Sequence, residues 1–266
     1  MHRLSRQIRF SINPFTAANP EGANSFASNP PGEGLALFFA LTVELAGNVE
    51  PDTGFVINVE QIDKKVRQNI VPIFARHIRD SYANGDELSL LDLTGLLKSC
   101  RRQLENKFLP AEMRKLTLAL NPFRNITIDS ENTDMVYFSE KFEFAAMHKL
   151  WNSRFSDSEN FEIFGKCAHP TGHGHNYVIE VTVRQAAGLD GFGIGIFEET
   201  VNSRFVELVD HRNLNVDIEY FAANIPTIEN IALFAWEKLN DKFENTQLHC
   251  VTIWETDKTS CSYYGN

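Results

Sequence analysis

Cysteine, long apolar runs and positive charge are all scarce in this sequence. Its 266 residues include four cysteines, which are too few and too scattered for a disulfide framework in a chain of this length. No segment reaches the ~18 consecutive apolar residues of a membrane span, and Met1 to Phe10 lacks the continuous apolar stretch of a signal peptide. We therefore expect a cytoplasmic protein with no membrane partner.

The shortage of positive charge excludes broad electrostatic binding of nucleic acid. The chain has 25 Lys and Arg residues against 35 Asp and Glu, a formal net charge of -10. A surface of this sign repels polyanions and acidic membranes. We expect no nucleic-acid partner, and an anionic substrate would need a local basic pocket.

Apolar residues are plentiful and suffice for two cores. They make up 43% of the chain, which contains 21 Phe, and a domain typically uses roughly 100 to 200 residues. The polar stretch Asn125 to Asp134 divides the chain near its middle. We predict two domains, 1–130 and 131–266.

The second half has the patterns of an α+β domain. Tyr177 to Arg184 alternates apolar and polar residues as a half-buried strand does, and Met135 to Phe144 is rich in β-formers. Two amphipathic helices are predicted over Phe197 to Leu208 and Ile228 to Phe243, the second capped by Thr227, before a strand over Leu248 to Thr256. This order indicates helices on one face of an antiparallel sheet.

The first half repeats this plan. Leu37 to Leu45 matches Tyr177 to Gln185 at an offset of 140 residues, and the Gly54-Phe55 turn matches Gly191-Phe192 at an offset of 137. A helical stretch follows in both halves. An offset held through several elements indicates a duplication, and so predicts two tandem domains.

Histidine is concentrated in the second half. His173-Gly174-His175 begins the Tyr177 strand, where a period of two sends both imidazoles to one face and Gly174 keeps the intervening position small. Two histidines at this spacing often occur by chance, or form hydrogen bonds without binding a metal. His148 is the candidate third ligand, because it shares a strand face with Phe144 and Ala146. Three histidines without a fourth protein ligand predict a catalytic zinc site with an open position.

Three further positions allow more than one interpretation. Cys167 is a fourth zinc ligand, a buried small side chain, or a thiolate base whose pKa is lowered by zinc and Lys166. Asp210-His211 is a charge pair at a helix end or a proton-transfer pair. Glu255 is an exposed acid at a strand end or a ligand-binding carboxylate.

The order of these segments resembles a known family. FEFAAMHKL, KCxxPxGHGHNY, VDHRNLN, PTxEN and ETxxxxxxYYG together are similar to the 6-pyruvoyltetrahydropterin synthase family over about residues 135 to 265. The resemblance implies tunnelling-fold (T-fold) domains, each an antiparallel four-stranded sheet with two helices on one face. It also implies zinc held by His148, His173 and His175, a catalytic trio of Cys167, Asp210 and His211, and a pterin ring anchored by Glu255 with Thr227 and Glu229 near the same pocket. His169 stands where we expect a small polar residue, so we interpret it as a loop side chain.

The resemblance also implies a reaction. The family's zinc-dependent lyases convert 7,8-dihydroneopterin triphosphate to 6-pyruvoyltetrahydropterin, in tetrahydrobiopterin biosynthesis, with elimination of triphosphate. The five residues between Cys167 and His173 are like this branch. Two alternatives remain open: a 6-carboxytetrahydropterin synthase of queuosine biosynthesis acting on the same substrate, and a non-catalytic module that binds pterin or zinc.

The first half lacks the matching chemistry, so we expect 1–130 to be a degenerate repeat and 131–266 to be the catalytic domain. T-fold proteins close barrels from several domains, and we therefore expect a homo-oligomer. Exposed basic residues of the first half would either line a shared site or form a solvated helix face: Lys64, Lys65, Arg101 and Arg102. The three histidines are matched in the first half by Pro14, Glu33 and Leu35. Cys167 is matched by Ala27, and Asp210-His211 by Ile73-Phe74.

Overall fold

The computed structural model describes residues 1–15, 36–186 and 188–265. The chain divides into two compact units, which we describe separately. Unit 1 comprises Met1–Phe138 and Gln185–Asp190, and unit 2 comprises Ser139–Arg184 and Gly191–Asn266. The roles assigned to 1–130 and 131–266 stay predictions, and Ala27, Glu33 and Leu35 lie outside the described residues.

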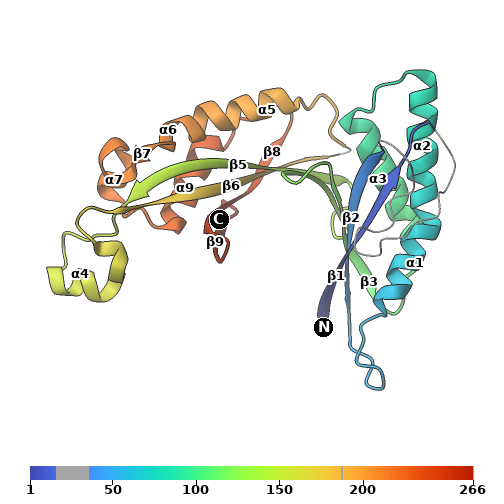
Figure 1. Ribbon diagram of the computed structural model, residues 1–266, viewed down its shortest axis with the longest axis horizontal. Helices are drawn as coiled ribbons and strands as arrows, with labels where there is room; N and C mark the ends of the chain where they lie inside the picture. The colour runs from blue at the N-terminus through green and yellow to red at the C-terminus, as the bar shows by residue number, and fades with distance from the viewer. Residues whose placement is uncertain (16–35, 187, 266) are drawn as a thin grey trace. The chain divides into compact units, whose positions relative to one another are not determined.

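Unit 1 is a four-stranded antiparallel sheet with helices on one side (Figure 1). Three helices join its second and third strands, and all three contact the sheet. Their inward side chains, such as Ile62, Phe74 and Leu97, are wholly buried. The strands, in sheet order, are β1 His2–Ile12, β2 Leu37–Gly47, β3 Glu112–Ala119 and β4 Arg124–Asp129, and the helices are α1 Val59–Asn69, α2 Val71–Asn84 and α3 Leu90–Leu104.

Two features of unit 1 differ from the sequence prediction. The polar stretch taken as a boundary contains β4, because Ile126 and Ile128 alternate into the core and pair with Leu118 and Leu116 of β3. Two inward isoleucines thus outweigh the polar residues between them. The described helices also include α3, a third where two were expected.

Unit 2 also places helices between its second and third long strands, β6 and β8. The sheet runs β5-β6-β8-β9, and the short β7 pairs with β5 in parallel. The strands are β5 Met135–His148, β6 His173–Ala186, β7 Arg212–Asn213, β8 Gln247–Thr256 and β9 Thr259–Tyr263, with β5 entering the unit at Ser139. The helices are α4 Asp157–Phe164, α5 Ile194–Val201, α6 Glu207–Val209, α7 Leu214–Asp217, α8 Tyr220–Ala223 and α9 Ile228–Leu239, with a 3-10 turn at Gly165–Ala168 and a π-helical turn at Asn202–Val206.

The predicted α+β class is confirmed, with three differences in unit 2. The helix expected over Phe197 to Leu208 is broken by the π-helical turn. α9 ends at Leu239 rather than Phe243, because Asn240 is extended and Asp241 has a φ of 58°. α4 was not expected, although Ser156 and Glu159 form a capping box at its start.

The core of unit 2 supports the inner face of β6. Tyr177, Ile179 and Val181 are wholly buried, and the ring of Phe144 on β5 stacks on Tyr177 at 4.9 Å. This packing fixes the strand end that carries the histidines. Among the described residues, no helix has the length and apolar character to cross a membrane.

Candidate functional site

Three histidines converge at one end of the unit 2 sheet. His148 ends β5, while His173 and His175 begin the neighbouring β6. Their ring centroids lie 4.5 to 5.2 Å apart, and His148 Nε2 is 3.0 Å from His173 Nε2. One ring nitrogen from each lies within 4.8 Å of the others. The expected sharing of a face is therefore confirmed.

Glycine at position 172 allows the two strands to approach. Gly172 has a φ of 68°, and a Cβ there would lie 2.7 Å from the carbonyl oxygen of His148. Any other residue would strain this turn and push His148 away. Gly174 behaves differently from the expectation, because a Cβ there would meet Ala146 O at an ordinary 3.6 Å. The position that must stay small is 172.

A backbone carbonyl fixes the orientation of His148. The ring is 1% exposed, and its Nδ1–H donates to the Pro226 carbonyl oxygen at 2.7 Å, with the Tyr177 hydroxyl 3.4 Å from the same nitrogen. A proton on Nδ1 leaves the lone pair on Nε2, facing His173. Burial lowers the pKa of His148 to about 4, so the ring is neutral at physiological pH.

The cluster fits a zinc ion by its own chemistry. Burial lowers the pKa of His173, which favours the neutral imidazole that a metal requires. His175 Nε2 is buried and, among the described residues, has no hydrogen-bond partner. The carbonyl behind His148 is a typical outer partner of a metal-binding histidine. A buried nitrogen without a hydrogen bond, beside two neutral rings, is what a bound cation would satisfy.

Glu255 lies against the cluster. Its Oε1 is 3.5 Å from both His148 Nε2 and His175 Nε2. The residue lies at the end of β8, beside β6, and its side chain is partly exposed. The structure thus brings the predicted anchor next to the predicted metal ligands.

Cys167 lies in the 3-10 turn that precedes β6, and its carbonyl accepts a hydrogen bond from the Leu150 N–H at 2.9 Å. Burial raises the pKa of the thiol, and the negative charge of Glu255 raises it further. The chain's own groups therefore act against the lowered pKa that the sequence suggested. The thiol is partly accessible.

Asp210 and His211 form a hydrogen-bonded pair beside β5. His211 Nδ1 donates to Asp210 Oδ2 at 2.8 Å, and the Ala145 N–H donates to Asp210 Oδ1 at 2.8 Å. These hydrogen bonds, that from Ala145 first, lower the pKa of Asp210. His211 has a φ of 56°, held by its N–H bond to Ala145 O, and its side chain is 82% exposed. The pair presents His211 Nε2 to solvent.

Within the described residues, the hydrogen bonds and ion pairs of Asp210 and His211 join them to each other and to main-chain groups such as those of Ala145 and Val206, not to the three-histidine cluster. The isolated unit therefore holds the expected sites in two groups. One contains the histidines with Glu255 and the nearby Cys167, and the other is the Asp210–His211 pair.

The remaining predicted residues lie at the start of α9 and before β6. Thr227 caps α9 by accepting the Asn230 N–H at 3.4 Å, and it follows Pro226, the partner of His148. Glu229 is exposed; burial raises the pKa of Cys261, and the charge of Glu229 raises it further. His169 is an exposed loop residue bonded to Thr171 Oγ1 at 2.8 Å. The sequence missed Pro226, because a backbone carbonyl leaves no signal in side-chain chemistry.

Comparisons with known proteins find similarity over the second half of the chain. A family model described as 6-pyruvoyl tetrahydropterin synthase matches residues 137–266. Human 6-pyruvoyl tetrahydrobiopterin synthase is 35% identical over 131 residues, which are 48% of this chain and 90% of that protein. The Drosophila melanogaster protein of the same name is 37% identical over 135 residues, 49% of this chain and 80% of that one. The solved structure of Caenorhabditis elegans 6-pyruvoyl tetrahydropterin synthase is 37% identical and covers 50% of this chain and 96% of its own, with a TM-score of 0.46.

Proposed function

The chain belongs to the 6-pyruvoyl tetrahydropterin synthase family, and we propose that it is a zinc-dependent lyase that converts 7,8-dihydroneopterin triphosphate to 6-pyruvoyltetrahydropterin with elimination of triphosphate. The observation that carries the proposal is the convergence of three histidines beside Glu255 in the half that the family model matches. Residues 131–266 are the proposed catalytic domain.

His148, His173 and His175 hold the metal in this proposal. The Pro226 carbonyl keeps the proton of His148 on Nδ1, so that its Nε2 offers a lone pair toward the nearby ring nitrogens of His173 and His175. Zinc bound there supplies Lewis acidity toward oxygens of the substrate side chain.

Glu255 orients the pterin ring. A pterin presents its amino group and a ring N–H side by side, and one carboxylate can accept both in a charge-assisted bidentate pair. The proposal is supported by the position of Glu255 against His148 and His175, which sets the anchored ring beside the metal ligands. Thr227 and Glu229 are proposed to lie near the same ring.

Cys167 and the Asp210–His211 pair move protons. The Cys167 thiolate removes a proton from a side-chain carbon, and the His211 imidazole relays a second proton as triphosphate departs. Asp210 keeps the proton of His211 on Nδ1 and leaves Nε2 free to act. Among the described residues, the hydrogen bonds of the Asp210–His211 pair do not reach the histidine cluster. We therefore propose a homo-oligomer in which a second copy of the chain contributes this pair to the active site.

Product analysis tests the function. The purified, zinc-loaded chain is incubated with 7,8-dihydroneopterin triphosphate, and the products are identified by chromatography and mass spectrometry. We expect a 6-pyruvoyl product with one triphosphate released for each substrate consumed. A 6-carboxy product with a two-carbon aldehyde would identify the other branch of the family instead. Unchanged substrate would leave a binding module as the function.

A further inference from the structure

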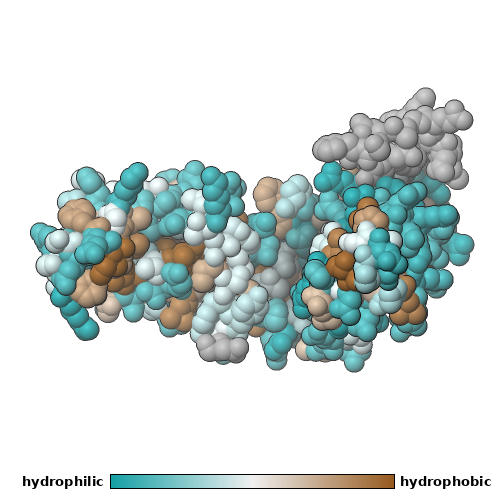
Figure 2. Space-filling view, turned by 90° about the horizontal axis from the view of Figure 1, so that it is seen from below, coloured by the Kyte–Doolittle hydropathy of each residue, from teal (hydrophilic) through white to brown (hydrophobic). Residues whose placement is uncertain are grey.

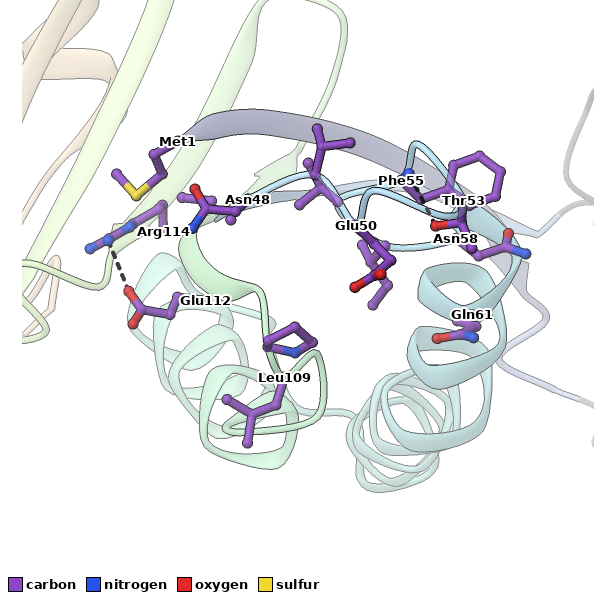
Figure 3. A pocket seen from close by; sticks show the side chains of 16 residues that line it. Met1, Asn48, Glu50, Thr53, Phe55, Asn58, Gln61, Leu109, Glu112 and Arg114 are labelled. Carbon is purple, nitrogen blue, oxygen red and sulfur yellow. Dashed lines mark hydrogen bonds and ion pairs between the residues drawn. The ribbon is translucent and has the colours of Figure 1, made fainter.

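Unit 1 contains a pocket that the proposed reaction does not use. The cavity has a volume of about 720 Å³, which is within the range of small-molecule sites. It lies between the loop that follows β2, the first turn of α1, and Leu109–Pro110 before β3 (Figure 3). All of its walls belong to unit 1.

The pocket of unit 1 and the histidine cluster of unit 2 lie at opposite ends of their respective sheets. In unit 2 the histidines lie at the end of the first strand and the start of the second. The pocket of unit 1 is lined instead by Gly47, where the second strand β2 ends, and by Glu112, where β3 begins. It is therefore not a remnant of the same site.

One carboxylate in the pocket is free to bind a ligand. Glu112 is paired with Arg114 at 2.8 Å, whereas the side chain of Glu50 has no hydrogen bond or ion pair to the described residues. The Glu50 backbone is fixed, because its N–H donates to Phe55 O and its carbonyl accepts the Gly54 N–H, both at 2.8 Å. Figure 3 shows the Glu50 carboxylate pointing into the hollow.

Amide and aromatic side chains also line this pocket. Asn58 uses its Oδ1 to cap α1 by accepting the Glu60 N–H at 2.9 Å, which leaves its NH2 group as a donor, and Gln61 follows one turn later. The Phe55 ring is 52% exposed, and Leu109 across the pocket is 63% exposed. Figure 2 shows hydrophobic residues set among hydrophilic ones on the face of the molecule that it views. A half-exposed ring provides a surface on which a planar ligand stacks.

We propose that this pocket binds a planar nitrogen heterocycle with two adjacent N–H donors, the 2-amino-4-oxopyrimidine edge that pterins and guanine share. The Glu50 carboxylate accepts both N–H groups, the amides of Asn58 and Gln61 pair with ring oxygen and nitrogen atoms, and Phe55 stacks on the ring. The unpaired negative charge of Glu50 disfavours phosphorylated ligands. Arg114 does not offset this charge, because it is already paired with Glu112. The occupant is therefore the free pterin or the nucleoside.

Calorimetric titration tests this site without relying on the proposed reaction. The full chain carries Glu255→Ala, which removes the proposed pterin anchor of unit 2, and the probes are neopterin and guanosine, with adenosine as the control that lacks the donor pair. We expect one ligand per chain for neopterin, for guanosine or for both, and binding of adenosine at least about tenfold weaker. Which probe binds identifies the source of the ring. Binding of neither probe would overturn the proposal.

Two matched carboxylate variants locate the ligand. On the same background, Glu50→Gln should weaken binding about ten- to hundredfold, the range for hydrogen bonds to a charged group, while Glu112→Gln changes it less than about threefold. If thermal unfolding shows that Glu50→Gln is misfolded, Phe55→Ala takes its place and should also weaken binding. Equal affinity in the folded Glu50→Gln chain would overturn the proposal, whatever product analysis of the Glu255 chain shows.

Discussion

Replacing His173 by Ala separates a metal ligand from a merely neighbouring histidine. His173 is partly exposed, so removing its imidazole leaves no buried cavity, and the metal-free chain should keep its unfolding free energy within about 0.5 kcal/mol. Zinc at a hundred times its dissociation constant stabilises a folded protein by about 2.7 kcal/mol. If the loss of one of three ligands weakens binding about a hundredfold, the same zinc concentration gives only about 0.4 kcal/mol.

Thermal unfolding with and without zinc measures this difference. The wild-type chain should gain several degrees on zinc addition, at roughly 2–4 °C per kcal/mol, and His173→Ala should gain almost none. His169→Ala is the matched control, because His169 is an exposed histidine four residues earlier that bonds to Thr171. A full zinc shift in His173→Ala, or its loss in His169→Ala, would refute the ligand assignment.

Four further outcomes follow from the same geometry. Cys167→Ala should keep zinc and lower turnover by about 10² to 10⁴, the scale of general acid–base catalysis, and loss of zinc measured by elemental analysis would make Cys167 a ligand. Glu255→Gln should keep zinc and raise the KM of the triphosphate substrate about tenfold or more, so an unchanged KM contradicts its role as anchor. Asp210→Asn should lower turnover while changing the unfolding free energy by less than about 1 kcal/mol, since its pair with the exposed His211 is worth little to folding, and denaturant titration beside a rate assay checks both. Burial lowers the pKa of His148 from 6.5 to about 4, so the unfolded chain binds this proton more readily than the folded chain. On the order of 3 kcal/mol of stability is therefore present above pH 6.5 and lost as the pH falls toward 4. The free energy of urea unfolding should depend less on pH in His148→Gln, and an unchanged pH dependence contradicts this.

The sequence predicted the parts of the site that depend on local periodicity. The alternation from Tyr177 onward marks β6, and the period of two then places His173 and His175 on one face. His148 follows from the same argument on β5, because each strand needs only its own pattern. The helix that Thr227 caps was predicted for a similar reason, since its signals are adjacent in the chain.

The parts that depend on distant backbone were not predicted. The Pro226 carbonyl reaches His148 across 78 residues, and the clash that reserves position 172 for glycine involves the His148 backbone rather than a side chain. Ile126 and Ile128 were hidden in a polar stretch, because two isoleucines suffice for a short strand once β3 pairs with them. Packing, rather than composition, decided these positions.

The metal dependence of triphosphate release tests the central claim most directly. Metal-free chain is mixed with 7,8-dihydroneopterin triphosphate, and phosphorus NMR follows free triphosphate before and after one equivalent of zinc is added. The histidine cluster predicts negligible release before the addition, and release matched by 6-pyruvoyltetrahydropterin after it. Release at the same rate without zinc, with chelator present throughout, would contradict the assignment of this site.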